Sequence, residues 1–258
     1  MGRESGLRGA DGPMKTMKLT AVLSVALLAA LSAQAQDSFR NLNFESATPS
    51  TPISGPLSPD AIYQPIGLAL PGWTAYLGTV QQTEVIQNSY GAGTAEVILL
   101  GPNYPAAGTF YGNGPGTIDG NYSVLLQQGG DPSGNGTLDN ASIAQTGYVP
   151  IGIQSLDFAA WTTPFTQFSV SFDGINLSPV VLGNGANYTL YGVNISSYAD
   201  TTGTLEFSAL SGSGASWLGL DNISFSTNVV ASPEPNIVAL SAIGGLLFGA
   251  RKWLARRS

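Results

Sequence analysis

Apolar and polar residues alternate in short runs along residues 38–227, and no run shows a convincing helical period. Alternation with a period of two places successive side chains on opposite faces of a strand. In the run 203–210, Leu205 and Phe207 are expected on one face and Glu206 on the other. Many short strands separated by Gly, Asn and Pro favour an all-β fold, a β-sandwich or jelly roll.

The predicted strands are residues 38–45, 80–86, 94–100, 122–127, 142–146, 153–161, 165–172, 179–182, 188–195, 203–210 and 217–226. Asp173-Gly174 follows one of these runs and predicts a hairpin turn, because both residues tolerate positive φ. Residues 48–71, 101–120 and 129–136 are rich in Pro, Gly and Asn and are expected to be loops.

The chain has no cysteine and no histidine. This composition excludes disulfides, thiolate metal sites and every mechanism that needs a His base or a Cys nucleophile. Catalysis by paired carboxylates remains possible in principle. Asp157 and Asp173 are the best pair that the predicted strands offer, and they do not stand out. We therefore expect the chain not to be an enzyme.

Charge is segregated along the chain. Of the 16 acidic residues, 14 follow the leader, whereas Arg40 is the only basic residue between the leader and Arg251. Nucleic acid is excluded as an expected partner, because its recognition needs Lys and Arg at the phosphates. An acidic surface suits solubility and the binding of divalent cations.

Residues 1–35 are interpreted as a leader. Residues 14–35 have the pattern of a secretory signal peptide, with an apolar stretch at 19–31 and a cleavage signal at 33–35. Because residues 1–13 are polar and glycine-rich, we expect the true start at Met14 or Met17. The predicted β-sandwich domain then covers residues 36–231.

Residues 232–258 combine three signals. Pro233, Glu234 and Pro235 end the folded part, residues 237–250 form a short uncharged hydrophobic helix, and a basic cluster closes the chain. The apolar stretch is shorter than the ~20 residues of a stable span. This order resembles the PEP-CTERM sorting signal of Gram-negative bacteria. The resemblance implies an exosortase as partner, a transient inner-membrane anchor and delivery to the cell surface or outside the cell; an ordinary membrane anchor is the alternative.

The body of the chain shows a second resemblance. Segments in the same order as in jelly-roll carbohydrate-binding modules and related galactose-binding-like domains are residues 41–45, 70–73, 121–126, 141–146, 153–161 and 218–225. In that family the first and last strands are neighbours and often hold a structural Ca²⁺, which here implies Glu45 and Asp221 as ligands. Asn222 stands where the family has a second acid. The alternative is that both carboxylates bind backbone amides at strand ends.

Aromatic side chains are the usual platform for sugar rings. The candidates in the predicted domain are Trp161, Trp73, Tyr76 and Trp217. Trp161 is expected opposite the core, because it alternates with Leu156 and Phe158 and so shares the face of Asp157. For Trp73 and Trp217, a place in the core is the competing interpretation.

Together these features predict an exported surface or matrix protein that is associated with exopolysaccharide and binds carbohydrate. The alternatives are a structural or adhesive protein without a ligand pocket, and a secreted hydrolase that acts on glycosides.

Overall fold

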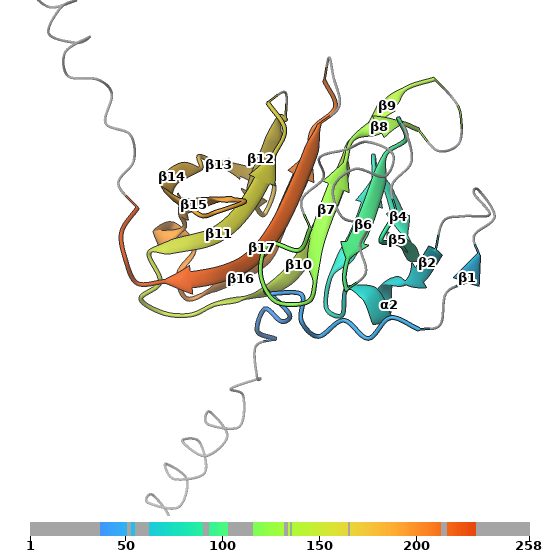
Figure 1. Ribbon diagram of the computed structural model, residues 1–258. Coiled ribbons are helices and arrows are strands. Elements are labelled where there is room, and N and C mark those ends of the chain that lie inside the picture. Colours follow the sequence, from blue (N-terminus) through green and yellow to red (C-terminus); the bar gives the residue numbers. More distant parts are fainter. Residues whose placement is uncertain are drawn as a thin grey trace, which may run out of the picture. The chain divides into compact units, whose positions relative to one another are not determined.

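The structure, a computed structural model, describes residues 37–50, 53–54, 62–89, 93–102, 116–131, 134, 136–164, 166–212 and 216–230. The predicted leader and sorting segment lie outside the described residues. Within them, two sheets enclose one hydrophobic core, so the predicted all-β sandwich is confirmed (Figure 1).

The larger sheet has nine strands. In spatial order they are β1 (Ile53–Ser54), β2 (Ile62–Pro65), β5 (Glu84–Gln87), β6 (Glu96–Leu100), β7 (Ser123–Gln127), β17 (Trp217–Ser226), β11 (Ser155–Thr162), β15 (Thr189–Asn194) and β14 (Val180–Asn184). Neighbouring strands are antiparallel except for β5 and β6, which are parallel. The bounds of β17 coincide with the predicted strand 217–226.

The smaller sheet has six strands. In spatial order they are β13 (Ile175–Leu177), β12 (Phe168–Phe172), β16 (Thr201–Ala209), β10 (Ala141–Val149), β3 (Thr74–Leu77) and β4 (Val80–Gln82). Strands β8 (Gly129–Gly130) and β9 (Leu138–Asp139) form a separate pair. The described helices are short, namely α2 (Ile66–Ala69) and the 3₁₀ turn η1 (Ser196–Tyr198).

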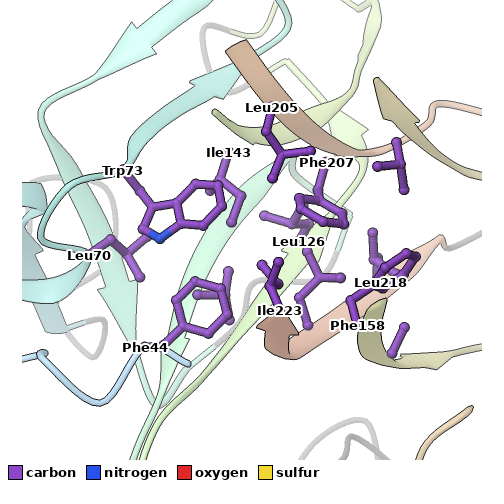
Figure 2. Close-up of a cluster of buried hydrophobic side chains, with 14 of the residues drawn as sticks. Phe44, Leu70, Trp73, Leu126, Ile143, Phe158, Leu205, Phe207, Leu218 and Ile223 are labelled. Carbon is purple, nitrogen blue, oxygen red and sulfur yellow. The ribbon is translucent and has the colours of Figure 1, made fainter. Parts of the chain in front are cut away.

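Aromatic and aliphatic side chains from both sheets meet in the core, as Figure 2 shows. The rings of Phe158 on β11 and Phe207 on β16 meet edge to face, with centroids 5.1 Å apart. Leu205 and Phe207 are buried in this core and Glu206 lies between them on the opposite face, as their alternation predicts. Burial of these side chains supplies the main favourable free energy of folding.

The predicted opening strand at residues 38–45 is wrong. Only Ser38 forms a bridge, and the chain then turns twice, with positive φ at Asn41 and Phe44. The side-chain oxygen of Asn41 accepts a hydrogen bond from Ser46 N, which stabilises the turn. This geometry drives the Phe44 ring into the core. The segment still reaches the last strand, because Ile223 N donates to Leu42 O.

The predicted loop at residues 48–71 is also wrong in part, because it contains β1, β2 and α2. Strands β3 and β13 were not predicted either. These elements have two to four residues each. Such short elements carry too few alternations to stand out from a turn.

The predicted hairpin at Asp173-Gly174 is confirmed. These two residues alone connect β12 to β13, and their φ angles are 48° and 76°. Positive φ at both central residues matches the right-handed twist of the flanking strands. Asp173 Oδ1 also accepts a hydrogen bond from Thr204 N on β16, which anchors the turn to the neighbouring strand.

Replacing Gly174 by Ala should lower the free energy of unfolding by about 1 kcal/mol, because a Cβ disfavours the left-handed conformation that this position adopts. Chemical denaturation of residues 36–258 would measure the change. Gly183→Ala on β14 is the matched control, since neither site has an atom within 4 Å of an added Cβ and only Gly174 has positive φ. Equal losses in the two variants would contradict the turn geometry.

Candidate functional site

The outer face of the larger sheet, turned away from the core, carries a second cluster of apolar side chains. Ile86, Ile98, Leu100 and Leu125 are buried there. They alternate along their strands with residues of the main core, such as Val97 and Leu99 on β6. Three aromatic side chains pack against this cluster, namely those of Tyr63, Trp161 and Trp217.

The strand register places these groups in two neighbouring rows across the sheet. The first row runs through Tyr63, Ile86, Ile98, Leu125, Gly219 and Trp161. The second row runs through Glu96, Gln127 and Trp217. Polar and aromatic side chains therefore lie beside an apolar centre, a composition common in ligand sites.

Trp161 and Trp217, here called the aromatic pair, lie next to each other on β11 and β17. Their ring centroids are 6.4 Å apart and their planes are inclined by 24°. Both side chains are half-buried. Two nearly parallel indoles with partial exposure provide a rigid apolar surface beside solvent.

A short turn after β11 fixes the backbone of Trp217. The Thr166 hydroxyl donates to Trp217 O over 2.9 Å and accepts from Thr163 N over 2.8 Å. Thr166 N donates to Thr163 O, which closes the turn. The turn after β11 thus holds the start of β17 beside the end of β11.

The outer face carries negative charge where β2, β5 and β6 lie side by side. Glu96 is only 8% exposed, and its Oε1 accepts a 2.7 Å hydrogen bond from Thr94 Oγ1. Burial, and then the carboxylates of Glu96 and Glu84, raise the pKa of Tyr63. These carboxylates therefore act on the Tyr63 hydroxyl at that end of the first row.

The other two aromatic candidates lie elsewhere. Trp73 is 4% exposed in the core, and its Nε1 donates to Asn41 O. A sugar ring needs an accessible face, so this burial removes Trp73 from the candidates. Tyr76 is half-buried on the smaller sheet, in register with Ser142 and Gln81. The structure therefore brings together only Trp161 and Trp217 of the four.

Glu45 and Asp221, the candidate calcium ligands, both accept hydrogen bonds from the segment before β7. Glu45 Oε1 accepts from Asn121 N and Tyr122 N, at 2.7 and 2.9 Å. Gly120 beside it has a φ of +58°, and an added Cβ would lie 2.4 Å from Glu45 Oε1. The segment therefore needs glycine at this position to approach the carboxylate.

Asp221 is 1% exposed and is held by three donors. Its Oδ2 accepts from Ser123 Oγ at 2.6 Å and from Asp119 N at 3.1 Å, and its Oδ1 accepts from Asn222 N at 2.7 Å. Burial raises the pKa of Asp221 to about 6, although all three hydrogen bonds oppose the rise.

The hydrogen bonds give both carboxylates a structural role without a cation. The described residues contain no group of three or more acidic side chains that could hold a metal ion. The amide nitrogen of Asn222 donates to Asp119 Oδ2 at 2.8 Å. These contacts favour the amide-binding role, and calcium binding stays a prediction.

The acid pair considered for catalysis is divided between the sheets. Asp157 belongs to β11 in the larger sheet, where it accepts from Ser155 Oγ. Asp173 lies in the turn of the smaller sheet. Their separation leaves that pair without a shared site.

Tyr63, Glu96 and Ser123 were not among the site residues predicted from the sequence. Tyr63 lay in a segment expected to be a loop because of its Pro and Gly residues. Pairing of distant strands brings Glu96 toward the aromatic pair, and a single sequence does not reveal that pairing.

None of the helices in the described part of the chain is long and apolar enough to cross a membrane. The predicted sorting motif at Pro233, Glu234 and Pro235 lies outside that part.

No family model and no curated protein matches the chain. One solved structure with a likeness is TmCBM61 in complex with β-1,4-galactotriose, at 10% identity and a TM-score of 0.38, covering 74% of this chain and 97% of that one. Another is the enzymatically active domain of bacteriophage CBA120 tailspike protein 4, at 14% identity and a TM-score of 0.32. That match covers 60% of this chain and 19% of the tailspike chain. Scores this low assign neither a fold nor a function.

The raised pKa of Asp221 predicts that its contribution to stability changes with pH. Its pKa of about 6 exceeds the value near 3.9 of an unfolded chain, so the folded state binds more protons between these values. Stability should therefore fall as the pH rises from about 4 to about 6. Relative to Asp221→Asn, the wild type should lose about 3 kcal/mol over this window.

Chemical denaturation of residues 36–258 at several pH values would measure this difference, whose pH dependence is the readout. A difference that stays constant between pH 4 and pH 7 would show an ordinary pKa. Thermal unfolding of the same protein with EDTA and with calcium chloride tests the predicted calcium ion. A melting temperature that rises with calcium supports it, and identical curves contradict it.

Proposed function

We propose that this chain is an exported protein that binds polysaccharide through the outer face of its larger sheet. The aromatic pair is the observation that carries the proposal, because it holds two half-buried indoles 6.4 Å apart outside the core. Apolar faces of sugar rings stack on such surfaces, and neighbouring polar groups orient the hydroxyls.

The position of the pair supports binding over a purely structural role. The main core is already filled by other rings, including those of Trp73, Phe158 and Phe207 (Figure 2). The pair instead packs on the second apolar cluster and keeps part of its surface exposed. A structural or adhesive protein without a ligand remains the rival, and it assigns the pair to covering that cluster.

The strand order supports a jelly-roll-like arrangement of the sandwich. Strand β17 at the end of the described chain lies between β7 and β11, and β10 lies between β3 and β16. From β10 onward the chain passes repeatedly from one sheet to the other, because β10, β12, β13 and β16 belong to the smaller sheet and β11, β14, β15 and β17 to the larger one, a pattern that fits the crossing connections of such folds.

The signal peptide and the sorting segment complete the proposal. The signal peptide sends the chain through the Sec pathway. The Pro233-Glu234-Pro235 motif, the apolar stretch and the basic cluster then present it to an exosortase at the inner membrane. The sandwich would be displayed on the surface of a Gram-negative cell or released, in contact with exopolysaccharide.

Removing either indole should weaken polysaccharide binding. In a glycan-array screen of residues 36–258, purified in mild detergent, Trp161→Ala and Trp217→Ala should each lower affinity on the order of tenfold, since stacking of one ring contributes roughly 1–1.5 kcal/mol. Calorimetry on the best polysaccharide would give the affinities.

Tyr76→Ala is the matched control, because it removes a half-buried aromatic ring from the smaller sheet. Its affinity should equal that of the wild type. Loss of binding in this control alone would move the site to the other sheet. If the folded wild type binds no polysaccharide, the proposed function is contradicted and the structural role is favoured.

Alanine at Pro233, Glu234 and Pro235 should stop sorting. The hydrophobic stretch and the basic cluster would remain, so the variant should accumulate in the inner membrane. Fractionation of cells that express the wild type or the variant would locate the protein. Normal surface delivery of the variant would contradict the role of the motif.

A further inference from the structure

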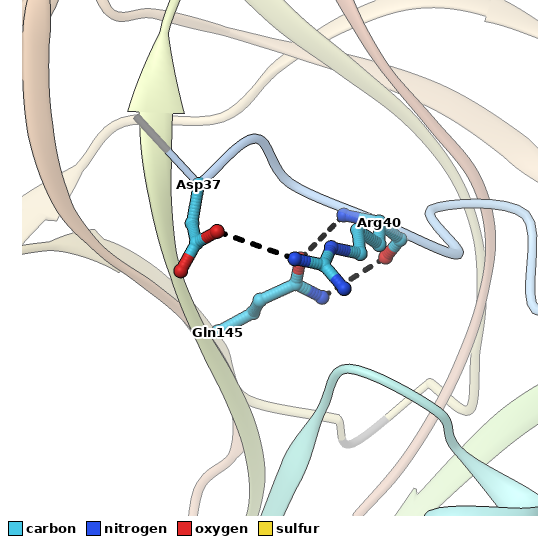
Figure 3. A network of polar contacts seen from close by, with 3 residues as sticks. All are labelled: Asp37, Arg40 and Gln145. Carbon is cyan, nitrogen blue, oxygen red and sulfur yellow. Dashed lines mark hydrogen bonds and ion pairs between the residues drawn. The ribbon is translucent and has the colours of Figure 1, made fainter. Parts of the chain in front are cut away.

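Positive charge is missing from almost the whole sandwich. The sequence has no Lys, Arg or His between Asn41 and Ala250. The remaining cation, Arg40, lies at the smaller sheet, where its backbone pairs with Gln145 of β10 and its guanidinium contacts Asp37 (Figure 3). The outer face of the larger sheet therefore has no basic side chain of its own strands to receive an acidic ligand.

Negative charge is present on the same outer face. Glu84 and Glu96 alternate with core residues of β5 and β6, so both lie on the side of the second apolar cluster. Glu96 is two strands from Trp217 in one row. At about 4.8 Å per strand, this corresponds to about 10 Å.

The negative charges of Glu84 and Glu96 also affect the pKa of Tyr63. Glu96 and Glu84 raise the pKa of Tyr63 in addition to the effect of burial, because a phenolate there would be repelled by both. Any other anion brought to this face meets the same repulsion. Because only 8% of Glu96 is exposed, its carboxylate acts on a ligand through its charge more than through direct contact.

We propose that this face selects uncharged polysaccharide and rejects polymers that carry carboxylate or sulfate groups. The proposal rests on the proposed function, because it concerns the ligand of the aromatic pair. An uncharged polymer gains the stacking without a charge penalty. An anionic polymer of the same backbone gains the stacking and also meets Glu84, Glu96 and the acidic surface of the domain.

The range of this repulsion makes it depend on salt. Charges about 10 Å apart interact strongly in dilute salt, whereas the Debye length of about 8 Å at physiological ionic strength already weakens them. The discrimination should therefore be largest at low salt and shrink as salt rises. Stacking on the indoles is apolar and should change little over the same range.

Matched polymers test the proposal. The probes are hydroxyethyl cellulose against carboxymethyl cellulose, and dextran against dextran sulfate. Residues 36–258 are used with Arg251, Lys252, Arg256 and Arg257 replaced by Gln, because this basic cluster would itself attract the anionic polymers. At low salt the uncharged member should bind on the order of tenfold more tightly, and this difference in affinity should narrow at 0.5 M salt, where the Debye length falls to roughly 4 Å.

Charge-removing variants locate the effect. Glu84→Gln and Glu96→Gln should each reduce the difference in affinity between the uncharged and the anionic polymer at low salt. Because Glu84 is exposed, its variant tests the charge even if replacement of the buried Glu96 disturbs folding. Glu206→Gln on the smaller sheet is the control, because it removes the same charge from a different sheet and should leave that difference unchanged.

The outcomes separate the two proposals. If the anionic member of a pair binds as tightly as the uncharged member at low salt, the charge selection is overturned and polysaccharide binding stands. If the folded wild type binds no member of any pair, polysaccharide binding fails and the selection fails with it. Equal narrowing by Glu206→Gln would assign the effect to net charge and overturn the role of this face.

Discussion

The centre of the larger sheet is buried on both faces, and the other features depend on this constraint. Every residue of β6 and β7 is buried, although successive side chains point to opposite sides. Val97, Leu99 and Val124 face the main core, whereas Ile98 and Leu125 face outward. Strands that are apolar on both faces need cover on both, and the outer cover includes the rings of the aromatic pair and Tyr63.

Polar contacts also join the central strands β7 and β17 to the segment before β7 and to Glu45. Asp221 on β17 accepts from Ser123 on β7 and from the backbone of Asp119. Glu45 receives the next amides of that segment. A buried carboxylate such as that of Asp221 is costly without donors, so its hydrogen bonds favour one arrangement of β17, β7 and the segment before β7. That arrangement holds Trp217 at the start of β17.

Local pattern was enough to predict part of this fold. Alternation located β17 and the inward face of Leu205 and Phe207, and Asp173-Gly174 located a turn, because each signal acts over a few residues. The opening strand failed because side-chain hydrogen bonding at Asn41 and burial of Phe44 outweigh its strand-like pattern. Strand β2 was missed because four residues ending in Pro65 resemble a loop.

The site was less predictable than the fold. Alternation correctly expected Trp161 opposite the core, but core burial of Trp73 and the outward position of Trp217 follow from which sheet each strand joins. The neighbours Glu96 and Tyr63 come from strands that pair through β5 and β7. Such pairings join residues far apart in the sequence, and no local residue pattern records them.

The most direct test of the central claim is an NMR titration of the indole N–H signals with the polysaccharide that binds best. The indole N–H signals of Trp161 and Trp217 should change their chemical shifts together and saturate with one dissociation constant, while the signal of the buried Trp73 stays unchanged. Binding that leaves the Trp161 and Trp217 signals unmoved would contradict a site on the outer face of the larger sheet.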